Sequence, residues 1–277
     1  MSIPGFQSFS GQSTKREWNG RAGLAWTPGG YGLRAAWQRG IQPVSTSTLA
    51  PVSTAGIAQD DRLVASGGRY ERAAALAFAE IGSRTPAPLA YDNNKVRNLG
   101  QLGFRIPVPQ IQFVELLRNA QLVNVNNADL LEGTPDFDEG RVETASLSLN
   151  HMISREWSVA ARYAHTRNRA TIFVRDESGA IVSGVSDARV PFVPRDLATL
   201  GVTWVSPLRV YLSAMAVHRS ARFADRDNTV KLPTDTTGTV AVFWESPGKS
   251  LILGAGAGNL GSKVAKEVYV LDARYRF

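Results

Sequence analysis

The residue types that most often carry catalysis are scarce in this sequence. Its 277 residues include no cysteine and three histidines, His151, His165 and His218. Disulfides, thiol nucleophiles and thiolate metal sites are therefore excluded, and the zinc hydrolases and cysteine proteases with them. A serine hydrolase would need a Ser, a His and an acid or amide partner, and the nearest set is His151 with Ser148 and Asn150. Because neighbouring residues of a strand face opposite ways, Asn150 and His151 diverge, and we expect neither an enzyme nor a cofactor.

Two further segments of the sequence are candidates for binding a metal ion or another ligand. The acidic residues of the first offer the carboxylate oxygens that Ca²⁺ prefers, but their spacing does not match an EF-hand loop. They are Asp129, Glu132, Asp136, Asp138 and Glu139. The second is the mixed-charge stretch Ala221–Asn228, which suits an anionic or sugar ligand or simple solvation. We expect solvated loops in both places, and no P-loop, dinucleotide or G-x-S-x-G motif occurs.

Charge and hydropathy narrow the class of protein. There are 31 Lys plus Arg against 24 Asp plus Glu, giving a net charge of +7 and a pI of about 9.9. No Lys and Arg stripe with interleaved aromatics is present, so we expect no nucleic-acid partner. No run of 18 apolar residues occurs, which argues against membrane-spanning helices. The first residues carry no secretion-signal pattern.

The strongest pattern in the sequence is an alternation with period two. Apolar residues occupy the even positions from Trp18 to Trp26, and polar or small residues lie between them. The turn Thr27-Pro-Gly-Gly30 follows, and the alternation resumes from Tyr31. Such a pattern around turn residues predicts a β-hairpin with one apolar face.

Repeated along the chain, this alternation predicts eleven strands of about 10 residues. Residues 70–79 also suit an Ala-rich helix, but we assign a strand because the neighbouring segments are strands. Short links are expected near residues 28, 82, 154, 206 and 247. Long links are expected at about 41–65, 95–140, 168–195, 219–235 and 259–266. Strict alternation of short turns and long loops is typical of transmembrane β-barrels, with the short turns on the periplasmic side.

Aromatic side chains identify what the apolar face touches. All six Trp residues have the apolar parity and lie near strand ends, whereas Leu, Val and Ala fill the strand middles. Amphipathic rings favour the boundary between lipid headgroups and tails, so outer-membrane lipid is the expected partner of this face. A strand of about 10 residues, tilted by about 40°, spans the apolar band of about 25 Å. The predicted membrane-interface aromatics are Trp18, Trp26, Tyr31, Trp37, Phe78, Trp157, Tyr163, Trp204, Trp244 and Tyr269.

The end of the chain resembles the closing strand of bacterial outer-membrane proteins. In Val268-Tyr-Val-Leu-Asp-Ala-Arg-Tyr-Arg-Phe277, the residues Leu271, Ala273, Tyr275 and Phe277 alternate as they do in that strand. The resemblance implies that this segment is the signal read by the barrel assembly machinery.

Residues 140–277 are similar to the C-terminal half of TonB-dependent receptor barrels. The stretches that carry this likeness are Val142–Asn150, Trp157–Thr166, Val190–Trp204 and Gly256–Gly261. The resemblance implies a bacterial cell outer membrane location, a ligand-uptake role, an N-terminal plug and TonB-type energy coupling. No plug, coupling box or signal peptide is visible in residues 1–277, which departs from the family pattern.

The predicted domain organisation follows from the strand count. Single-chain bacterial barrels have an even number of strands, and eleven would be half of a 22-stranded transporter. We therefore expect residues 1–277 to be a partial barrel and the C-terminal portion of a longer protein. Residues 1–15 would be an external loop remnant, and 95–140 a long external loop with a short helix. An exporter or anchor barrel behind a periplasmic repeat domain, a general porin and a soluble β-sandwich remain the alternatives.

Overall fold

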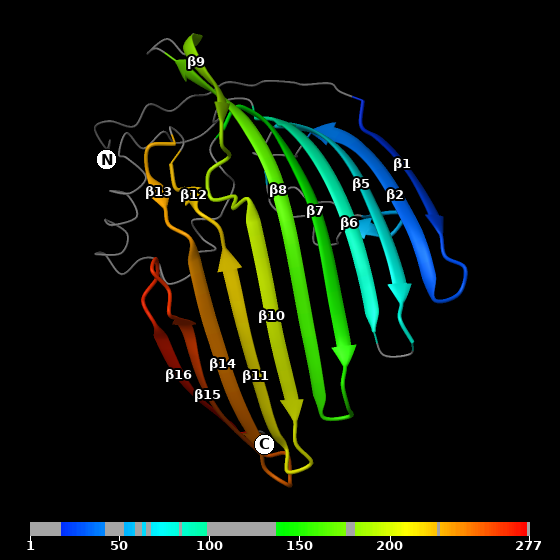
Figure 1. Ribbon diagram of the computed structural model, residues 1–277, viewed down its shortest axis with the longest axis vertical. Helices are drawn as coiled ribbons and strands as arrows, with labels where there is room; N and C mark the ends of the chain where they lie inside the picture. Colours follow the sequence, from blue (N-terminus) through cyan, green and yellow to red (C-terminus); the bar gives the residue numbers. More distant parts are fainter. Residues whose placement is uncertain are drawn as a thin grey trace, which may run out of the picture.

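The structure, a computed structural model, describes residues 18–41, 53–58, 63–64, 68–82, 85–98, 137–175, 181–225 and 228–275. Over these ranges the chain is all-β, and no helix of a length and apolarity suited to crossing a membrane is found in them. Eleven long strands form one antiparallel sheet in sequence order, with a twelfth strand beside β8 (Figure 1). The predicted fold class and the eleven strands are confirmed.

The strands of the sheet differ in length more than the alternation suggested. They are β1 (Gly20–Trp26), β2 (Tyr31–Ile41), β5 (Arg69–Glu80), β6 (Pro86–Arg97), β7 (Glu139–Met152), β8 (Trp157–Arg175), β9 (Ile181–Ala188), β10 (Asp196–Val205), β11 (Val210–Arg219), β14 (Asp235–Glu245), β15 (Leu251–Leu260) and β16 (Val268–Tyr275). Two small hairpins form separate two-stranded sheets, one of β3 (Ser53–Thr54) with β4 (Ile57–Ala58) and one of β12 (Arg222–Phe223) with β13 (Lys231–Leu232).

The sheet has two edges, because the strand order begins with β1 and ends with β16. Ten reversals of direction separate the two edge strands, so they run the same way. Among the described residues, neither edge strand has a second neighbour. The sheet is therefore an open, curved wall (Figure 1).

All five predicted short connections lie at one edge of the wall, as Figure 1 shows. Serine hydroxyls organise three of them. The Ser154 hydroxyl accepts from the Trp157 N–H at 3.1 Å, that of Ser206 from Leu208 at 3.1 Å, and that of Ser246 from Leu251 at 3.0 Å. Such side-chain bonds to nearby backbone favour tight turns over continued strand. The predicted separation of short turns from long loops is confirmed.

The register of neighbouring strands brings apolar side chains together on one face of the sheet. Leu33, Ala77, Leu89, Leu147 and Tyr163 occupy directly opposed positions on five neighbouring strands. We call this side the apolar face; its large residues are exposed, including Leu89 at 54% and Leu147 at 53%. The other side, the polar face, carries Gln38, Arg72 and Asn94 on β2, β5 and β6, all buried.

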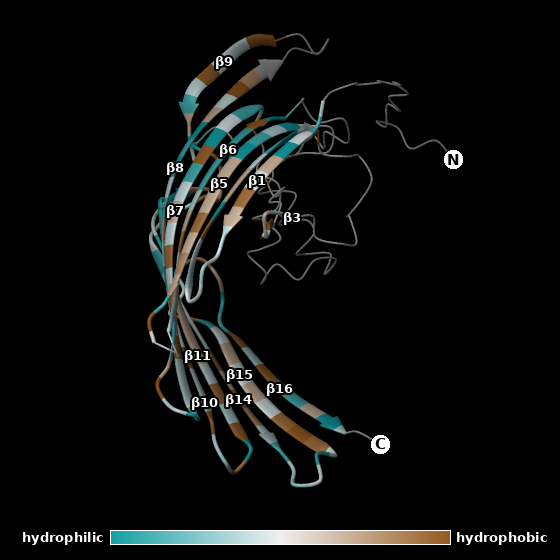
Figure 2. Cartoon of the chain, turned by 90° about the vertical axis from the view of Figure 1, so that its right-hand side faces the viewer, coloured by the Kyte–Doolittle hydropathy of each residue, from teal (hydrophilic) through white to brown (hydrophobic). Residues whose placement is uncertain are grey.

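The polar face is the concave one. The β3–β4 hairpin lies against it, since Gln38 Nε2 donates to the Thr54 hydroxyl at 3.0 Å. Figure 2 shows the sheet curving around the side on which β3 lies. The apolar residues therefore point outward from the curve, which is opposite to a soluble sandwich or barrel, whose apolar residues point inward.

A small hydrophobic cluster covers the polar face near the long-loop edge. The sheet contributes Tyr70, Val96, Val142, Ala170, Ile172 and Ala188, and connecting segments supply the rest: Val64, Phe137 and Val190. These residues are the principal buried apolar group of the described chain. Their burial fixes the connecting segments to the wall at this end.

The predicted face of Phe78 was wrong. Register pairs Phe78 with Gly32 and Leu76 with Arg34, so both side chains lie on the polar face. The Arg34 guanidinium carbon lies 5.6 Å from the Phe78 ring centroid, a cation–π contact above the space that Gly32 leaves. Ala73, Ala75, Ala77 and Ala79 form the outward series of β5 instead. Phe78 is therefore not a membrane-interface aromatic.

The segment 168–195 was predicted to be a loop, and this is also wrong in part. Strand β8 continues to Arg175, and β9 returns antiparallel beside it, with Phe173 opposite Gly184. The β8–β9 hairpin extends beyond the neighbouring strands at the long-loop edge (Figure 1). Residues 1–17 and 99–136, which include the expected loop remnant, the helix, and Asp129, Glu132 and Asp136, lie outside the described residues.

The packing at Gly32 gives a test of the β2–β5 register. A Cβ at this position would lie 2.5 Å from the tip of the Phe78 ring, so Gly32→Ala should destabilise the sheet by about 1 kcal/mol through overpacking. Gly201→Ala is the matched control, because its Cβ would meet no atom closer than 3.8 Å. Denaturant unfolding in detergent, followed by Trp fluorescence, measures both. Adding Phe78→Ala to Gly32→Ala should recover part of the loss; equal effects of the two glycine variants would refute the register.

Candidate functional site

The concave polar face is the candidate functional surface, because its side chains have the groups that bind polar ligands. Arg72 forms an ion pair with Asp92 on the neighbouring strand, and its Nε donates to Asp92 Oδ2 at 2.6 Å. The Thr144 and Thr166 hydroxyls lie 3.1 Å apart across β7 and β8. These groups come from β5 to β8, whose register aligns them. The wall thus presents hydrogen-bonding groups toward the space it encloses.

Buried amides and a carboxylate fasten the connecting segments to the long-loop edge. Asn98 Nδ2 donates to the Phe137 carbonyl at 3.1 Å, and Asn168 Oδ1 accepts from the Val190 N–H at 3.0 Å. Asp138 Oδ2 accepts from the Phe173 N–H at 2.7 Å. Each bond satisfies a backbone group that no strand pairs, which keeps the rim of the concave face in place. The role of these residues could not be predicted from the sequence, since isolated Asn and Asp near strand ends give no distinctive signal.

The acidic residues considered for Ca²⁺ are engaged otherwise where the structure describes them. Asp138 is buried in the backbone contact just given, and Glu139 forms an ion pair with Arg97 at 2.7 Å. In the described part of the chain, no group of three or more His, Asp or Glu side chains is arranged to hold a metal ion.

The three histidines lie on the apolar face, each beside a polar partner on another strand or turn. His165 Nδ1 and the Tyr163 hydroxyl both contact Asp196 Oδ1, at 2.8 and 2.7 Å. His218 Nδ1 lies 2.8 Å from the Thr236 hydroxyl, and His151 Nδ1 lies 2.8 Å from that of Thr85. His151 and Asn150 alternate in the β7 register, so the expected divergence of the Ser148, Asn150 and His151 set is confirmed.

Aromatic residues gather at two levels of the apolar face rather than in a single ring. At the short-turn edge, the Trp26 and Tyr31 ring centroids lie 5.9 Å apart, as do those of Trp157 and Trp204; Trp244 lies at the same edge. Toward the long-loop edge, the ring centroids of Trp18 and Trp37 lie 6.1 Å apart. Tyr163 on β8 and Tyr269 on β16 are the other predicted aromatics on this side. Apart from Phe78, the predicted aromatics thus share the apolar face.

The closing strand has the predicted alternation. Leu271 and Tyr269 are exposed on the apolar face, paired in register with Ala255 and Ala257, and Ala273 and Tyr275 continue the series. Phe277 lies outside the described residues.

Local hydrogen bonds hold residues 221–225 and 228, the described part of the segment considered as a ligand site. The Asp225 carboxylate accepts from the Thr229 N–H at 2.9 Å, the Thr229 hydroxyl at 2.6 Å and the Val230 N–H at 2.7 Å. Partial burial acts to raise the pKa of Asp225, but these hydrogen bonds outweigh it and lower the pKa below its ordinary 3.8. Asn228, at a φ of 55°, bonds both ways with the Arg189 backbone. The carboxylate therefore stabilises the loop itself.

The wall has the same fold as solved outer-membrane receptors. A siderophore receptor, PiuA from Acinetobacter baumannii, aligns with a TM-score of 0.56 and 15% identity over 93% of this chain and 35% of that one. The ferric-catecholate import receptor Fiu from E. coli K12 aligns at 0.55 and 13% over 94% and 35%. For the ferric yersiniabactin uptake receptor FyuA from Yersinia pestis the values are 0.53 and 13% over 93% and 36%.

Sequence comparison adds no relative to these structures, since no protein-family model and no curated protein matches the chain. The chain spans about a third of the length of the receptors it resembles. Its fold is that of a part of a TonB-dependent receptor-like outer-membrane β-barrel.

Asp225 gives a pH-dependent prediction. Because its folded pKa is lowered, its contribution to loop stability is present above pH 3.8 and is lost as the pH falls through the folded pKa. Above pH 3.8, Asp225→Ala should remove the protection of the Thr229 and Val230 amides, a loss of about 1 kcal/mol. Hydrogen exchange of residues 221–232, corrected for intrinsic rates, measures this. Asp187→Ala, at an exposed position, is the control; a protection that does not change with pH or with Asp225→Ala would contradict the assignment.

Proposed function

We propose that this chain forms part of the wall of a bacterial outer-membrane barrel of the TonB-dependent type, which takes up a ligand through its polar interior. The observation that supports this most directly is the exposed apolar face. Leu33, Leu89, Leu147 and Leu200 are each about half exposed on the outward side, and Leu24 is about two-thirds exposed. Soluble monomers rarely expose a continuous apolar surface of this extent.

Lipid is the environment that fits this surface. Transfer of each exposed Leu side chain from water to lipid is favourable by about 25 cal/mol for every Å² of apolar surface removed from water. In water, the same surface would make the wall prone to aggregation. The aromatic levels at both edges suit headgroup boundaries. On the concave side, the Arg, Asn and Thr side chains would line an aqueous interior, as in barrels whose polar residues face the lumen.

The open sheet supports a partial wall. A spanning sheet must pair its edges, because an unpaired N–H or C=O in hydrocarbon costs several kcal/mol. Eleven strands and about a third of the receptors' length fit one portion of a 22-stranded transporter. We propose that the rest of that protein supplies the remaining strands, a plug that gates the interior and the contact with TonB, and that barrel assembly machinery reads the closing strand.

The proposed ligand class is a metal chelate. Three structures with this fold are a siderophore receptor, a ferric-catecholate import receptor and a ferric yersiniabactin uptake receptor, and another, OprC, is a copper transporter that aligns with a TM-score of 0.50 and 13% identity over 93% of this chain and 36% of that one. Arg34 and Arg162 on the concave side would favour an anionic chelate.

Cysteine labelling tests the membrane placement, since the chain has no cysteine of its own. In outer-membrane vesicles, Leu89→Cys and Leu200→Cys should resist a water-soluble maleimide, whereas Ser146→Cys and Thr199→Cys should react, because the two pairs lie on opposite faces of β6, β7 and β10. All four should react after unfolding. Equal reactivity of the two pairs in folded protein would reject the lipid-facing assignment.

Uptake assays test the transport role. Cells that produce the whole protein should accumulate iron supplied as a siderophore chelate more than fivefold faster than cells lacking it, and a proton uncoupler should abolish the difference, as coupling to TonB requires. Flux that is unaffected by the uncoupler would instead indicate a general porin. Unchanged uptake by correctly inserted protein would indicate an anchor or exporter.

A further inference from the structure

A row of charged side chains crosses the outward face just beyond the apolar band. Register places Arg39, Glu71, Lys95, Arg141 and Arg169 directly opposite one another on β2, β5, β6, β7 and β8. They continue the series of Leu89 and Leu147, so they project from the apolar face and not into the concave side. We call Lys95, Arg141 and Arg169, on three adjacent strands, the cationic row.

Three cations in adjacent register are unfavourable without an anion. Opposed side chains on neighbouring strands lie about 5 Å apart at Cβ, where like charges destabilise the pair. Arg141 contacts Glu143, and Arg169 reaches Asp187 only at 3.9 Å, with both side chains about four-fifths exposed. Lys95 has no ion pair within the described ranges. The row therefore retains positive charge that an external anion would neutralise.

The height of the cationic row matches lipid headgroups. Lys95 follows Tyr91, an exposed aromatic on the same face, by four residues. At about 3.3 Å per residue and a tilt of about 40°, this is about 10 Å along the membrane normal. The polar layer of a leaflet is about 5–8 Å thick, and Lys and Arg side chains extend far enough to reach down into it.

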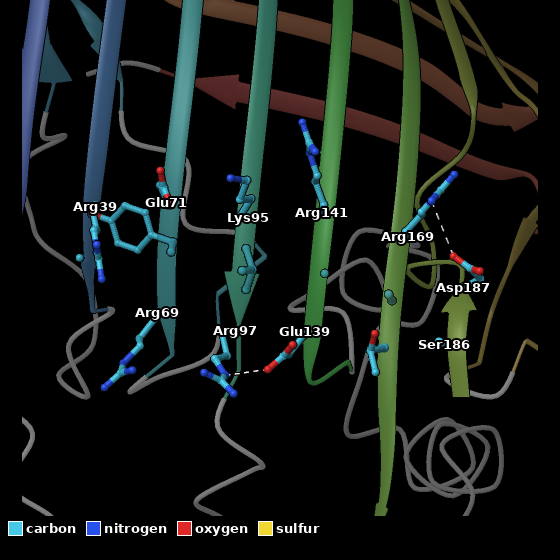
Figure 3. Close-up of a pocket in the computed structure, with 16 residues that line it drawn as sticks. Arg39, Arg69, Glu71, Lys95, Arg97, Glu139, Arg141, Arg169, Ser186 and Asp187 are labelled. Atoms are coloured by element: carbon cyan, nitrogen blue, oxygen red, sulfur yellow. Dashed lines mark ion pairs between the residues drawn. The ribbon is translucent and has the colours of Figure 1, made fainter. Parts of the chain in front are cut away.

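The surface there is also hollowed. A cavity of about 670 Å³ is lined by the row and its neighbours, with six cationic and three acidic side chains. Figure 3 shows Lys95, Arg141 and Arg169 on adjacent strands, with Arg97 turned toward Glu139 beside them. A depression of this size accommodates a phosphorylated headgroup.

We propose that the cationic row binds the phosphate groups of lipid headgroups in the leaflet next to the long loops. This inference rests on the proposed membrane placement of the apolar face. Arg and Lys donate several charge-assisted hydrogen bonds to phosphate oxygens, and such bonds are stronger than those to neutral acceptors. The wall would thus be held at a fixed height by an electrostatic contact in addition to its apolar band.

Brominated lipids test this site, because bromine quenches Trp fluorescence on contact. The whole protein, of which this chain would form one part of the wall, is reconstituted in phosphatidylcholine vesicles that contain phosphatidic acid, with the bromine on one lipid or the other. Phosphatidic acid should be preferred over phosphatidylcholine by about fivefold or more, the effect of a basic residue near an anionic surface. Lys95→Gln with Arg169→Gln should remove most of this preference, and Lys95→Arg with Arg169→Lys should keep it.

The matched control loses two charges from the concave face, Arg21→Gln with Arg274→Gln, and should keep the preference. Quenching by both lipids with no preference, or a preference that survives Lys95→Gln with Arg169→Gln, would overturn the site and leave the membrane placement intact. Absence of quenching by either lipid would refute the membrane placement itself. Loss of the preference on adding inorganic phosphate would show recognition of the free anion, which overturns a lipid site.

Discussion

The structure depends on one constraint: the backbone ladder and the side-chain alternation must stay in step across every pair of neighbouring strands. A slip of one residue between β2 and β5 would move Arg34 and Gln38 to the face that now carries Leu33 and Ala35. In a hydrocarbon environment such a slip would place an Arg where it costs about 2–4 kcal/mol. The hydrophobic rows, the polar interior and the charged rim are therefore all consequences of a single register.

The same register divides the wall along the strands. In the middle of β7, the outer face carries Ala145, Leu147 and Leu149, and the concave face carries Thr144, Ser146 and Ser148. Toward the long-loop edge both faces change: the concave face gains the buried cluster around Val142 and Ile172, and the outer face gains Arg and Glu. A strand such as β8 therefore passes through two environments, which explains why it is nearly twice as long as β10.

Much of this architecture could be predicted from the sequence, because period two and Ser-Pro or Pro-Gly turns are local signals. The eleven strands, the short turns and the outward Trp residues follow from them. The phase of β5 could not be predicted, since Ala73 to Ala79 give no contrast between faces and the larger Leu76 and Phe78 suggest the wrong one. Only pairing with Gly32 and Arg34 decides it.

The candidate sites were harder to predict than the fold, for a related reason. Asn98, Asp138 and Asn168 act through backbone groups far away in sequence, and no local pattern marks such partners. Lys95, Arg141 and Arg169 are separated by up to 74 positions, and their adjacency arises only when three strands align. The sequence gives the number of charged residues, whereas the strand register determines which of them lie close together.

The direction of the edge strands has a geometric consequence for closure. Since β1 and β16 run the same way, joining them directly would create a parallel seam in a wall that is otherwise antiparallel. Completing a cylinder with antiparallel neighbours throughout takes an odd number of additional strands, whatever their sequence. The number of added strands is therefore restricted by the strand directions alone, independently of their side chains.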